Sequence, residues 1–324
     1  MSLFEPRKNL KPYEYPELIS YMKAIQQSYW LVDEFNFTQD IQDFFTECTE
    51  KERNVIKNSI LAIAQIEVSV KTFWGNIYNH IPKPEIAMVG YTFSDSEVRH
   101  AEAYSELLER LGLNREFERI TEIPAINDRV DYLTKALKDV NSTNHKDYIL
   151  SLLLFSVFIE NVSLFSQFLI LMSFNKYKNS FRAVSNVIQA TQQEEALHGQ
   201  FGMQIVNIIK SENPEIFDDE LIARVVAACR KAQKAENKVL DWIFEKGELD
   251  FLPRYIVENF INDRYNTSLQ SIGLEPLFDV DKNALQAVKW FDEETTATSH
   301  VDFFAKRPTS YSKFTQAITE DDLF

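Results

Sequence analysis

The stretch Tyr91-Thr-Phe-Ser-Asp-Ser-Glu97-Val-Arg-His100-Ala-Glu-Ala-Tyr104 decides how the rest of the chain is interpreted. Glu97, His100 and Tyr104 are spaced three and four residues apart, so a helix places all three on one stripe. Apolar residues continue this stripe in both directions, namely Ile86, Phe93, Leu107 and Leu111. Because a buried carboxylate without a partner is costly, the stripe indicates a compensating group, and a metal ion would serve.

A second Glu-x-x-His pair, Glu195-Ala-Leu-His198, follows later in the chain. The sequence has only five histidines, and two of them come three residues after a glutamate. A lone glutamate precedes each pair: Glu67 lies 30 residues before Glu97, and Glu160 lies 35 residues before Glu195. Each of these glutamates also lies on an apolar stripe of helical period. The arrangement Glu … Glu-x-x-His therefore occurs twice.

Two lone glutamates and two Glu-x-x-His pairs, one contribution per helix, form the ligand set of a carboxylate-bridged dinuclear metal site in a four-helix bundle. Four carboxylates and two imidazoles suit iron or manganese. A dry apolar shell around the site would protect an oxidant from side reactions. The expected ligands are Glu67, Glu97, His100, Glu160, Glu195 and His198, and the expected shell is Phe155, Leu164, Phe165, Phe168 and Ile188.

The composition points to an all-α protein with one large core. The 324 residues include 7 Gly, 10 Pro and 45% hydrophobic residues, and long stripes have the period of a helix. The formal charge of −15 comes without a basic cluster, so nucleic acid and anionic membranes are not expected partners. Two cysteines form no CxxC motif, and the first residues contain no apolar signal-peptide core. A reducing cytoplasm is the expected compartment.

The apolar stripes predict helices over most of the chain. A capping box at Ser94 to Glu97 would start one helix later, but its apolar stripe begins well before Ser94 and Pro84 can open it. From about Thr295 the chain is polar and aperiodic, and we see no internal domain boundary. The expected helices are 16–30, 38–45, 50–80, 84–111, 125–139, 146–174, 180–210, 218–247, 252–271 and a short 283–291.

The segment from Tyr148 to Phe174 is long and apolar enough to span a bilayer. Glu160 lies at its middle, and a charge at that depth is rare in a helix that faces lipid. A helix buried on all sides at the centre of a large bundle has the same composition. We therefore expect a central core helix.

The order Glu67, Glu97-x-x-His100-x-x-x-Tyr104, Glu160, Glu195-x-x-His198 resembles the small, radical-generating subunit of class I ribonucleotide reductase. The resemblance covers nearly the whole chain and includes the tail Phe303-Phe304-x-x-Arg307-x-x-x-Tyr311. It implies a ferritin-like helical bundle at residues 1–305 and a flexible tail at 306–324 that docks the large subunit. It also implies a cytoplasmic homodimer that supplies an oxidising equivalent to the large subunit for ribonucleotide reduction.

The resemblance also suggests roles for four further residues. Trp30 is similar to the family's electron-transfer tryptophan; the alternative is a packed core aromatic. Tyr104 is either a candidate radical site or a packed phenol. Tyr311 is a candidate either for passing the oxidising equivalent on or for docking the partner. Glu194 occupies the place of an aspartate that usually precedes the last ligand glutamate, or is a solvated neighbour.

The chain departs from the family pattern in three ways. Glu67 stands where many members have Asp, and Glu there is found in branches with manganese-containing centres, so a dimanganese or Mn/Fe centre is slightly favoured over diiron. Glu194 replaces the usual Asp. The spacing from Glu160 to Glu195 is one residue longer than usual, which a π-bulge would absorb. The oxidant and any activating protein stay open.

Four other functions share some of these features. A ferritin-type iron store would use a similar ligand set but does not require a C-terminal extension. A two-metal oxygenase or desaturase would need a substrate channel rather than a tail. The family's ligand-binding oxidase branch is the nearest alternative, against which the tail motif argues. A purely structural bundle would leave four glutamates and two histidines buried without compensation.

Overall fold

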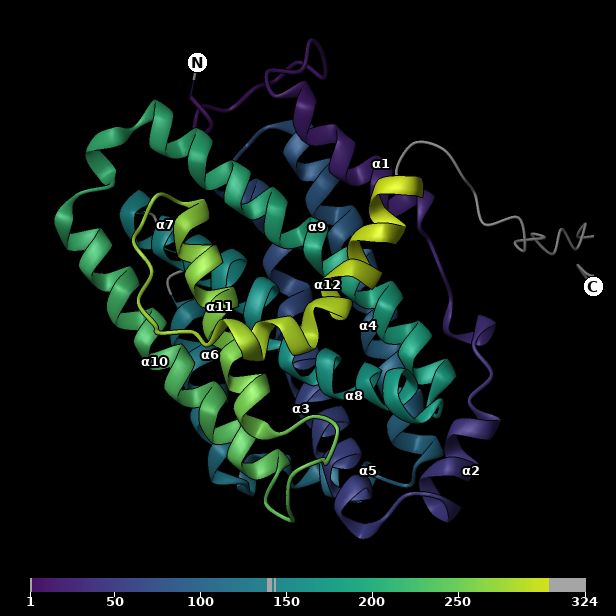
Figure 1. Ribbon diagram of the computed structural model, residues 1–324. Helices are drawn as coiled ribbons and strands as arrows, with labels where there is room; N and C mark the ends of the chain where they lie inside the picture. Colours follow the sequence, from purple (N-terminus) through teal and green to yellow (C-terminus); the bar gives the residue numbers. More distant parts are fainter. Residues whose placement is uncertain (1, 139–141, 143, 303–324) are drawn as a thin grey trace, which may run out of the picture.

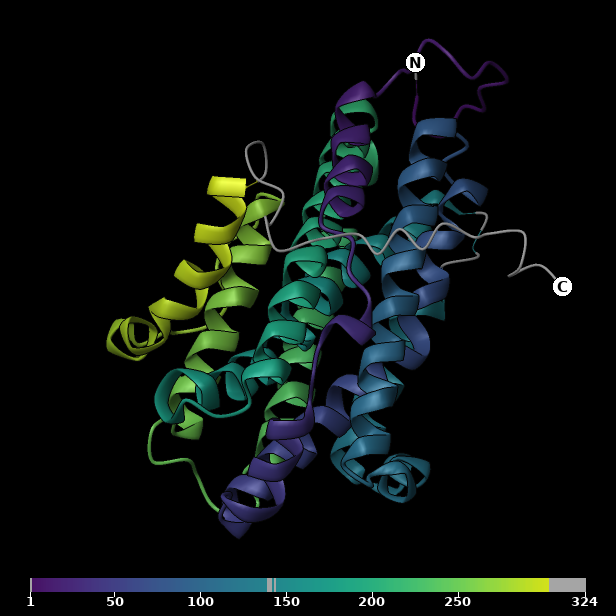
Figure 2. The same cartoon turned by 90° about the vertical axis from the view of Figure 1, so that its right-hand side faces the viewer.

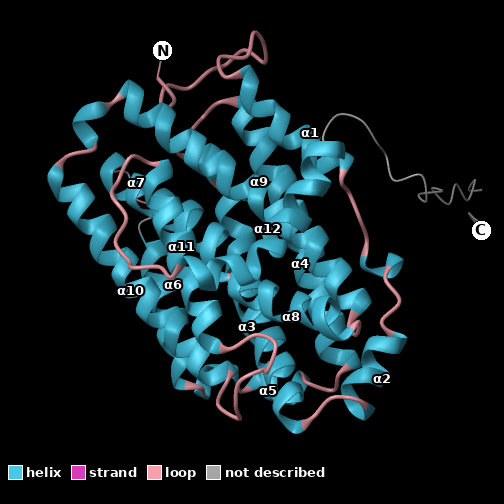
Figure 3. Ribbon diagram, in the orientation of Figure 1, coloured by secondary structure: helices cyan, strands magenta, loops and turns pink. Residues whose placement is uncertain are grey.

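The computed structural model describes residues 2–138, 142 and 144–302. Within this part of the chain the secondary structure is helical, and Figure 3 shows no strand in it. The only extended pairing among these residues is an isolated bridge between Leu249 and Leu252. The all-α prediction is confirmed. Tyr311 and the expected tail, residues 306–324, lie outside the described residues.

Twelve α-helices and one π-helix make up the described fold. Short 3-10 turns at Pro16–Leu18, Val32–Glu34, Ile77–Asn79, Ile120–Glu122 and Pro214–Ile216 connect some of them. The helices are α1 (Ile19–Gln27), α2 (Thr38–Thr46), α3 (Glu50–Gly75), α4 (Pro84–Arg110), α5 (Asn114–Glu118), α6 (Pro124–Leu137), α7 (His145–Leu153), the π-helix (Leu154–Ser163), α8 (Phe165–Lys178), α9 (Arg182–Glu212), α10 (Asp219–Ile243), α11 (Arg254–Ser271) and α12 (Lys282–Asp302).

The long helices run side by side as an elongated bundle (Figures 1 and 2). Helix α3 packs along α4, and α9 packs along the π-helix and also reaches α4. Helix α1 lies across α4 and α9, whereas α6, α10 and α11 cover the other side of the π-helix. These contacts bury one continuous apolar core, in which α3, α4, the π-helix and α9 are central. The bundle architecture agrees with the sequence prediction.

Local sequence signals explain where helices α3 and α4 begin. At α3, Thr49 Oγ1 accepts a hydrogen bond from the Glu52 amide at 3.3 Å, and Glu52 Oε2 accepts one from the Thr49 amide at 2.9 Å. Helix α4 begins with Pro84 in its first turn and continues through Ser94 without a break. The capping box at Ser94 is therefore not a helix start.

Several predicted boundaries are wrong, among them the ends of α8, at Lys178 rather than 174, and of α10, at Ile243 rather than 247. Helix α1 ends at Gln27, where both the amide and the hydroxyl of Ser28 bond to the Ala24 carbonyl at 3.1 Å, and this leaves Trp30 beyond the helix. Helix α3 ends at Gly75 rather than near residue 80. Helix α12 continues to Asp302 rather than stopping at residue 291, although no apolar stripe continues there.

The apolar segment His145–Lys178 has the length and composition of a membrane span, but nearly all of its most apolar window is buried in the bundle. It is not one regular helix, because the π-helix separates α7 from α8. The core-helix interpretation agrees with this burial. The π-helix contains Glu160, so the extra residue between Glu160 and Glu195 coincides with a change of helical period, as the spacing indicated.

Candidate metal centre

Four neighbouring helical segments bring the six predicted ligand residues together. Helix α3 carries Glu67, α4 carries the first Glu-x-x-His pair, the π-helix carries Glu160 and α9 carries the second pair. All six side chains are at most 2% exposed. The i, i+3 spacing places the Glu and His of each pair on the same inward face. The centre therefore lies inside the bundle, out of contact with solvent.

The ligand atoms form two overlapping clusters. One cluster comprises Glu67, Glu97, His100 and Glu195, and the other comprises Glu97, Glu160, Glu195 and His198. Within each cluster the ligand atoms lie within 4.8 Å of one another. Glu97 and Glu195 belong to both clusters, which is the position of carboxylates that bridge two ions.

Both imidazoles direct Nδ1 toward the shared carboxylates. His100 Nδ1 lies 3.0 Å from Glu195 Oε1 and 3.6 Å from Glu97 Oε2. His198 Nδ1 lies 3.0 Å from Glu97 Oε1 and 3.3 Å from Glu195 Oε2. The two rings thus approach the same pair of carboxylates from opposite helices, α4 and α9.

The other nitrogen of each imidazole is held from behind. His100 Nε2 lies 2.8 Å from Glu194 Oε2, and His198 Nε2 lies 2.9 Å from the Ser96 hydroxyl. A partner on Nε2 fixes the orientation of the ring and favours a neutral tautomer whose Nδ1 lone pair faces the cluster. The Trp74 indole likewise donates a 2.9 Å hydrogen bond to Glu160 Oε1.

The electrostatics of the centre reflect the concentration of acids in a dry space. Burial and the charge of Glu195 raise the pKa of the Glu160 carboxyl well above its usual range. Burial lowers the pKa of His100, but the hydrogen bonds with Glu194 and Glu195 outweigh it and hold that pKa well above its usual value. The same opposition of burial and carboxylate hydrogen bonds raises the pKa of His198. The carboxylates therefore favour a proton on each imidazole, and a cation held at Nδ1 would replace that proton and leave the neutral tautomer.

The residues present fit a metal centre of hard oxygen and imidazole ligands. Both oxygens of Glu97 and of Glu195, and Nδ1 of His100 and of His198, lie 3.0–3.6 Å from one another but make no well-aligned hydrogen bond within the described part of the chain. Buried polar atoms left in this way are costly, and two cations between them would compensate the cost. Carboxylates with imidazoles, without a thiolate, are typical of iron and manganese sites.

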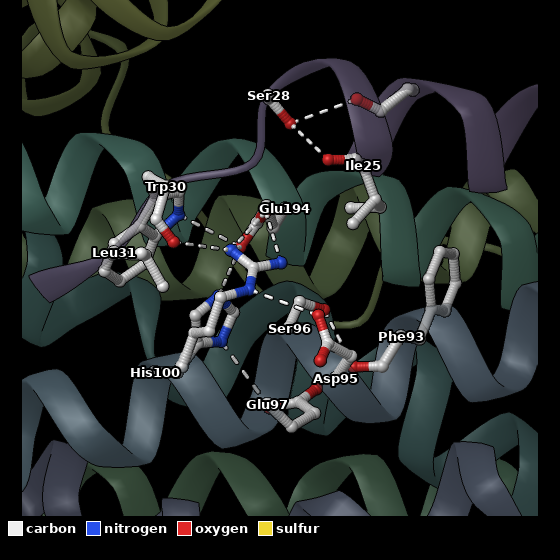
Figure 4. Close-up of polar contacts among 12 residues, drawn as sticks. Ile25, Ser28, Trp30, Leu31, Phe93, Asp95, Ser96, Glu97, His100 and Glu194 are labelled. Carbon is white, nitrogen blue, oxygen red and sulfur yellow. Dashed lines mark hydrogen bonds and ion pairs between the residues drawn. The ribbon is translucent and has the colours of Figure 1, made fainter. Parts of the chain in front are cut away.

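Glu194 connects this cluster to Trp30. Figure 4 shows the Glu194 side chain between the Trp30 indole and His100. Its Oε2 accepts a 3.2 Å hydrogen bond from Trp30 Nε1, and its Oε1 lies 3.0 Å from both terminal nitrogens of Arg99. Glu194 is fully buried, so its interpretation as a solvated neighbour is wrong.

Tyr104 lies one helical turn beyond His100 on α4 and is fully buried. Burial raises the pKa of its phenol, the nearby Thr191 hydroxyl opposes that effect, and the charge of Glu67 adds to it. The phenol therefore stays protonated at neutral pH. The residues of the expected dry shell, Phe155, Leu164, Phe165, Phe168 and Ile188, are all buried. Phe155 packs against Trp74, whose indole bonds Glu160, whereas Phe165 packs against Phe291 of α12.

Three residues of the site were missed by the sequence interpretation. Arg99 lies between the two ligands of α4 and was given no role. Ser96, one residue before Glu97, was given no role. Trp74 was recognised as an apolar member of the Glu67 stripe, and its place seven residues after Glu67 was the signal that it faces the same centre.

Comparison with known families supports one assignment. A family model described as ribonucleotide reductase, small chain, matches residues 7–284. A probable ribonucleoside-diphosphate reductase small subunit of Invertebrate iridescent virus 3, 048L, is 26% identical over 328 residues, covering 97% of this chain and 86% of the relative. A ribonucleoside-diphosphate reductase subunit beta of Chlamydia pneumoniae is 25% identical over 298 residues, covering 87% and 83%.

Solved structures share the fold at lower identity. The R2 subunit of Clostridium botulinum superposes with a TM-score of 0.79 at 19% identity, covering 87% of this chain and 89% of that one. The dimanganese(II)-NrdF of Streptococcus sanguinis gives 0.74 at 15% identity, covering 88% and 100%. An R2-like ligand-binding oxidase with a Mn/Fe cofactor gives 0.69 at 17% identity, covering 82% and 95%. These likenesses show a common architecture.

Proposed function

Because the chain belongs to the ribonucleotide reductase small-chain family, we propose that Glu67, Glu97, His100, Glu160, Glu195 and His198 hold the dinuclear metal centre that initiates ribonucleotide reduction. The observation that carries this proposal is the pair of overlapping buried clusters that share Glu97 and Glu195. The oxidising equivalent serves a large subunit, where the nucleotide is reduced. This chain has two cysteines, Cys48 after α2 and Cys229 on α10, and they form no CxxC motif that could reduce a ribose.

Two bound iron or manganese ions would supply one-electron redox chemistry with an oxygen species. The residues of the chain provide the environment for it. Four glutamate charges offset those of two divalent ions, while Glu194 and Ser96 fix the two imidazole rings from behind. The buried aromatic and aliphatic shell excludes water and so limits loss of the oxidising equivalent to solvent.

Trp30 is the proposed exit for the oxidising equivalent. The chain of hydrogen bonds from Trp30 through Glu194 to His100 supports this role, because it links an aromatic ring at the edge of α1 to a metal ligand. Tyr104 is a proposed radical site. Its burial beside the cluster supports this role, as does the raised pKa of its phenol, which keeps the hydroxyl protonated. Tyr311 is the proposed next carrier.

A manganese-containing centre, dimanganese or Mn/Fe, is proposed in preference to diiron. What supports it is Glu67 at the first ligand position, because Glu rather than Asp there resembles the branches of the family with manganese-containing centres. Reconstitution with manganese, iron or both, followed by turnover assays with the large subunit, tests the preference. Turnover with iron alone, together with a tyrosyl signal that Tyr104→Phe abolishes, would contradict it.

The assembly is proposed to be a cytoplasmic homodimer that binds the large subunit through residues 306–324. Exposed apolar side chains on the adjacent helices α3 and α4, Val68, Tyr91 and Val98, support an interface between two copies. Residues 1–305 are proposed to form the metal-binding domain. Light scattering of the protein alone, and with the large subunit, distinguishes these two associations.

Metal analysis tests the central assignment. Glu97→Ala and His198→Ala should each reduce the metal content well below two ions per chain, since each removes a ligand from the cluster. Glu102→Ala, on the exposed face of α4, is the matched control and should keep two ions. Full occupancy in both ligand variants would exclude the proposed centre.

A further inference from the structure

Two arginines bind main-chain carbonyls of the π-helix that carries Glu160. Arg264 of α11 donates from Nε to the Asn161 carbonyl at 2.6 Å, one residue after Glu160. Arg129 of α6 donates to the Ser163 carbonyl, also at 2.6 Å, three residues after Glu160. Both contacts fall at the end of the π-helix, where the chain returns to α-helical pairing at Phe165.

This junction is where a π-helix needs external donors. In a π-helix each amide bonds the carbonyl five residues back, and in an α-helix the carbonyl four residues back. Where the hydrogen-bond spacing changes from five residues to four, the next amide bonds a carbonyl two positions further along the chain. The carbonyl between the two acceptors is left without an intrahelical donor. A buried carbonyl without a donor is costly, so a guanidinium group that reaches it stabilises the π-helical form over a regular α-helix.

Arg129 connects this junction to the other helices of the centre. It is fully buried, and besides Ser163 it donates to the Ala62 carbonyl of α3 at 3.2 Å. Its Nε lies 3.2 Å from Glu236 Oε1 of α10, which balances its charge. Since α3 carries Glu67, one guanidinium ties together the two helices that bear the lone glutamates.

The opposite side of the π-helix is shaped by two glycines of α9. A Cβ on Gly199 would lie 2.7 Å from Asn161 Oδ1, and a Cβ on Gly202 would overlap the Ser156 side chain. The glycines therefore allow the wider π-helix to approach α9, the helix of Glu195 and His198. The arginines bind one side of the π-helix, and the glycines of α9 pack closely against its other side. Glu160 can therefore shift little along or around the helix.

We propose that Arg129 and Arg264 are positioning residues, which hold the π-helical register that places Glu160 in the metal centre. The inference rests on the proposed function, because it concerns the cluster of Glu97, Glu160, Glu195 and His198. Loss of a donor should let the segment 154–163 relax toward α-helical pairing. That change rotates Glu160 away, while the cluster that contains Glu67 and His100 keeps its ligands.

Titration of the full-length protein with Mn(II) alone tests this. Arg264→Gln should weaken binding of one of the two ions about 10- to 100-fold, the range typical of residues that support a ligand, and leave the other ion unchanged. Arg264→Lys, which keeps a donor and the charge, should restore part of the affinity. Arg254→Gln is the matched control, because Arg254 begins the same helix and pairs instead with Asp241 and Glu258.

Amide hydrogen exchange of the metal-free protein gives a second readout that does not depend on metal. Arg264→Gln should accelerate exchange in residues 154–165 and not in α3 or α4. Arg129→Lys should accelerate exchange in 154–165 and also in α3 around Ala62, whose carbonyl Arg129 binds. Wild-type affinity for both ions in Arg264→Gln, unchanged exchange in 154–165, or equal acceleration in all helices would each overturn the inference. A wild-type protein that binds no Mn(II) would overturn the metal centre and the inference together.

Discussion

The indole nitrogen of Trp30 donates a 3.2 Å hydrogen bond to Glu194 Oε2. The same oxygen lies 2.8 Å from His100 Nε2, so one carboxylate connects the tryptophan to a proposed metal ligand. Trp30→Phe removes the donor and shrinks the ring, which should cost on the order of 1–2 kcal/mol of stability. We expect two bound metal ions and loss of most turnover with the large subunit. Wild-type turnover in this variant would reduce Trp30 to a packed aromatic.

The ion pair between Arg99 and Glu194 should be essential for stability. Arg99 is 4% exposed, so Glu194→Gln leaves a buried guanidinium without its counter-charge and should destabilise the protein by about 3–5 kcal/mol. Arg99→Met with Glu194→Gln should cost less than the two single changes added together. Asp95→Asn is the control, because Asp95 is 57% exposed and its pair with Arg99 should contribute below about 1 kcal/mol. Denaturant unfolding measures all four.

The contact between Gly202 and Ser156 predicts an unusual sign for a glycine substitution. Replacing a helical glycine by alanine normally stabilises a helix by up to about 1 kcal/mol. Here the new methyl group overlaps Ser156, so Gly202→Ala should destabilise by about 1–3 kcal/mol. Adding Ser156→Gly should recover part of the loss. Gly75→Ala is the comparison, because its nearest neighbour is the Ser94 hydroxyl at 3.0 Å, and a stable Gly202→Ala variant would argue against the close approach.

Glu85 should make the attachment of the N-terminal segment sensitive to acid. Its Oε1 accepts hydrogen bonds from the amides of Glu14 at 2.8 Å and Tyr15 at 3.2 Å, and its carboxylate pairs with Arg7. Burial raises the pKa of Glu85, but these hydrogen bonds outweigh it and leave the pKa below its usual value. A folded-state pKa below the unfolded one stabilises the protein above the unfolded value, about 4.3, and this stabilisation is lost as the pH falls.

Denaturant unfolding over a pH series measures this effect. Glu85→Gln should lower the unfolding free energy by about 3 kcal/mol at pH 7, since it removes the nearest carboxylate of Arg7 and leaves only that of Glu14, at 3.9 Å. The difference from wild type should shrink as the pH falls below about 4.3. Glu5→Gln, an exposed change in the same segment, should leave the pH dependence as it is. A constant difference between wild type and Glu85→Gln across the series would contradict the prediction.

The six residues at the centre could be predicted because their evidence is periodic and local. Glu67 and Glu160 stand on apolar stripes, and the i, i+3 spacing of Glu97 and His100 fixes their common face whatever surrounds the helix. The one-residue excess before Glu195 also indicated the π-helix. These features need no knowledge of how distant segments pack.

The supporting residues could not be predicted, because their roles depend on contacts between distant segments. Arg99 pairs with Glu194, which lies 95 residues away, and Arg264 reaches a carbonyl 103 residues away. No pattern in the sequence marks a carbonyl as lacking a donor. The position of Trp30 was missed because α1 ends at Gln27, three residues before the predicted end, and no residue type in the sequence marks that end.

Residues 312–324 should bind the large subunit. They include Phe314, Ile318, Leu323 and Phe324 among Glu320, Asp321 and Asp322. Spaced apolar anchors can dock in a groove of a partner, and the acids should increase the association rate toward a basic rim more than the final affinity. Deleting these residues should therefore leave helical content and metal stoichiometry unchanged and abolish both binding to the large subunit and turnover.

A point substitution separates docking from electron transfer. Tyr311→Phe keeps the apolar ring but removes the phenolic proton, so it should retain binding to the large subunit and lose turnover. Replacing Glu320, Asp321 and Asp322 by their amides is the complementary change, which should slow association and weaken its dependence on salt, with a smaller effect on dissociation. Binding kinetics at two salt concentrations, measured beside turnover, distinguish the two roles. If the truncated protein still supports full turnover at ordinary concentrations, residues 312–324 are only a solubilising end.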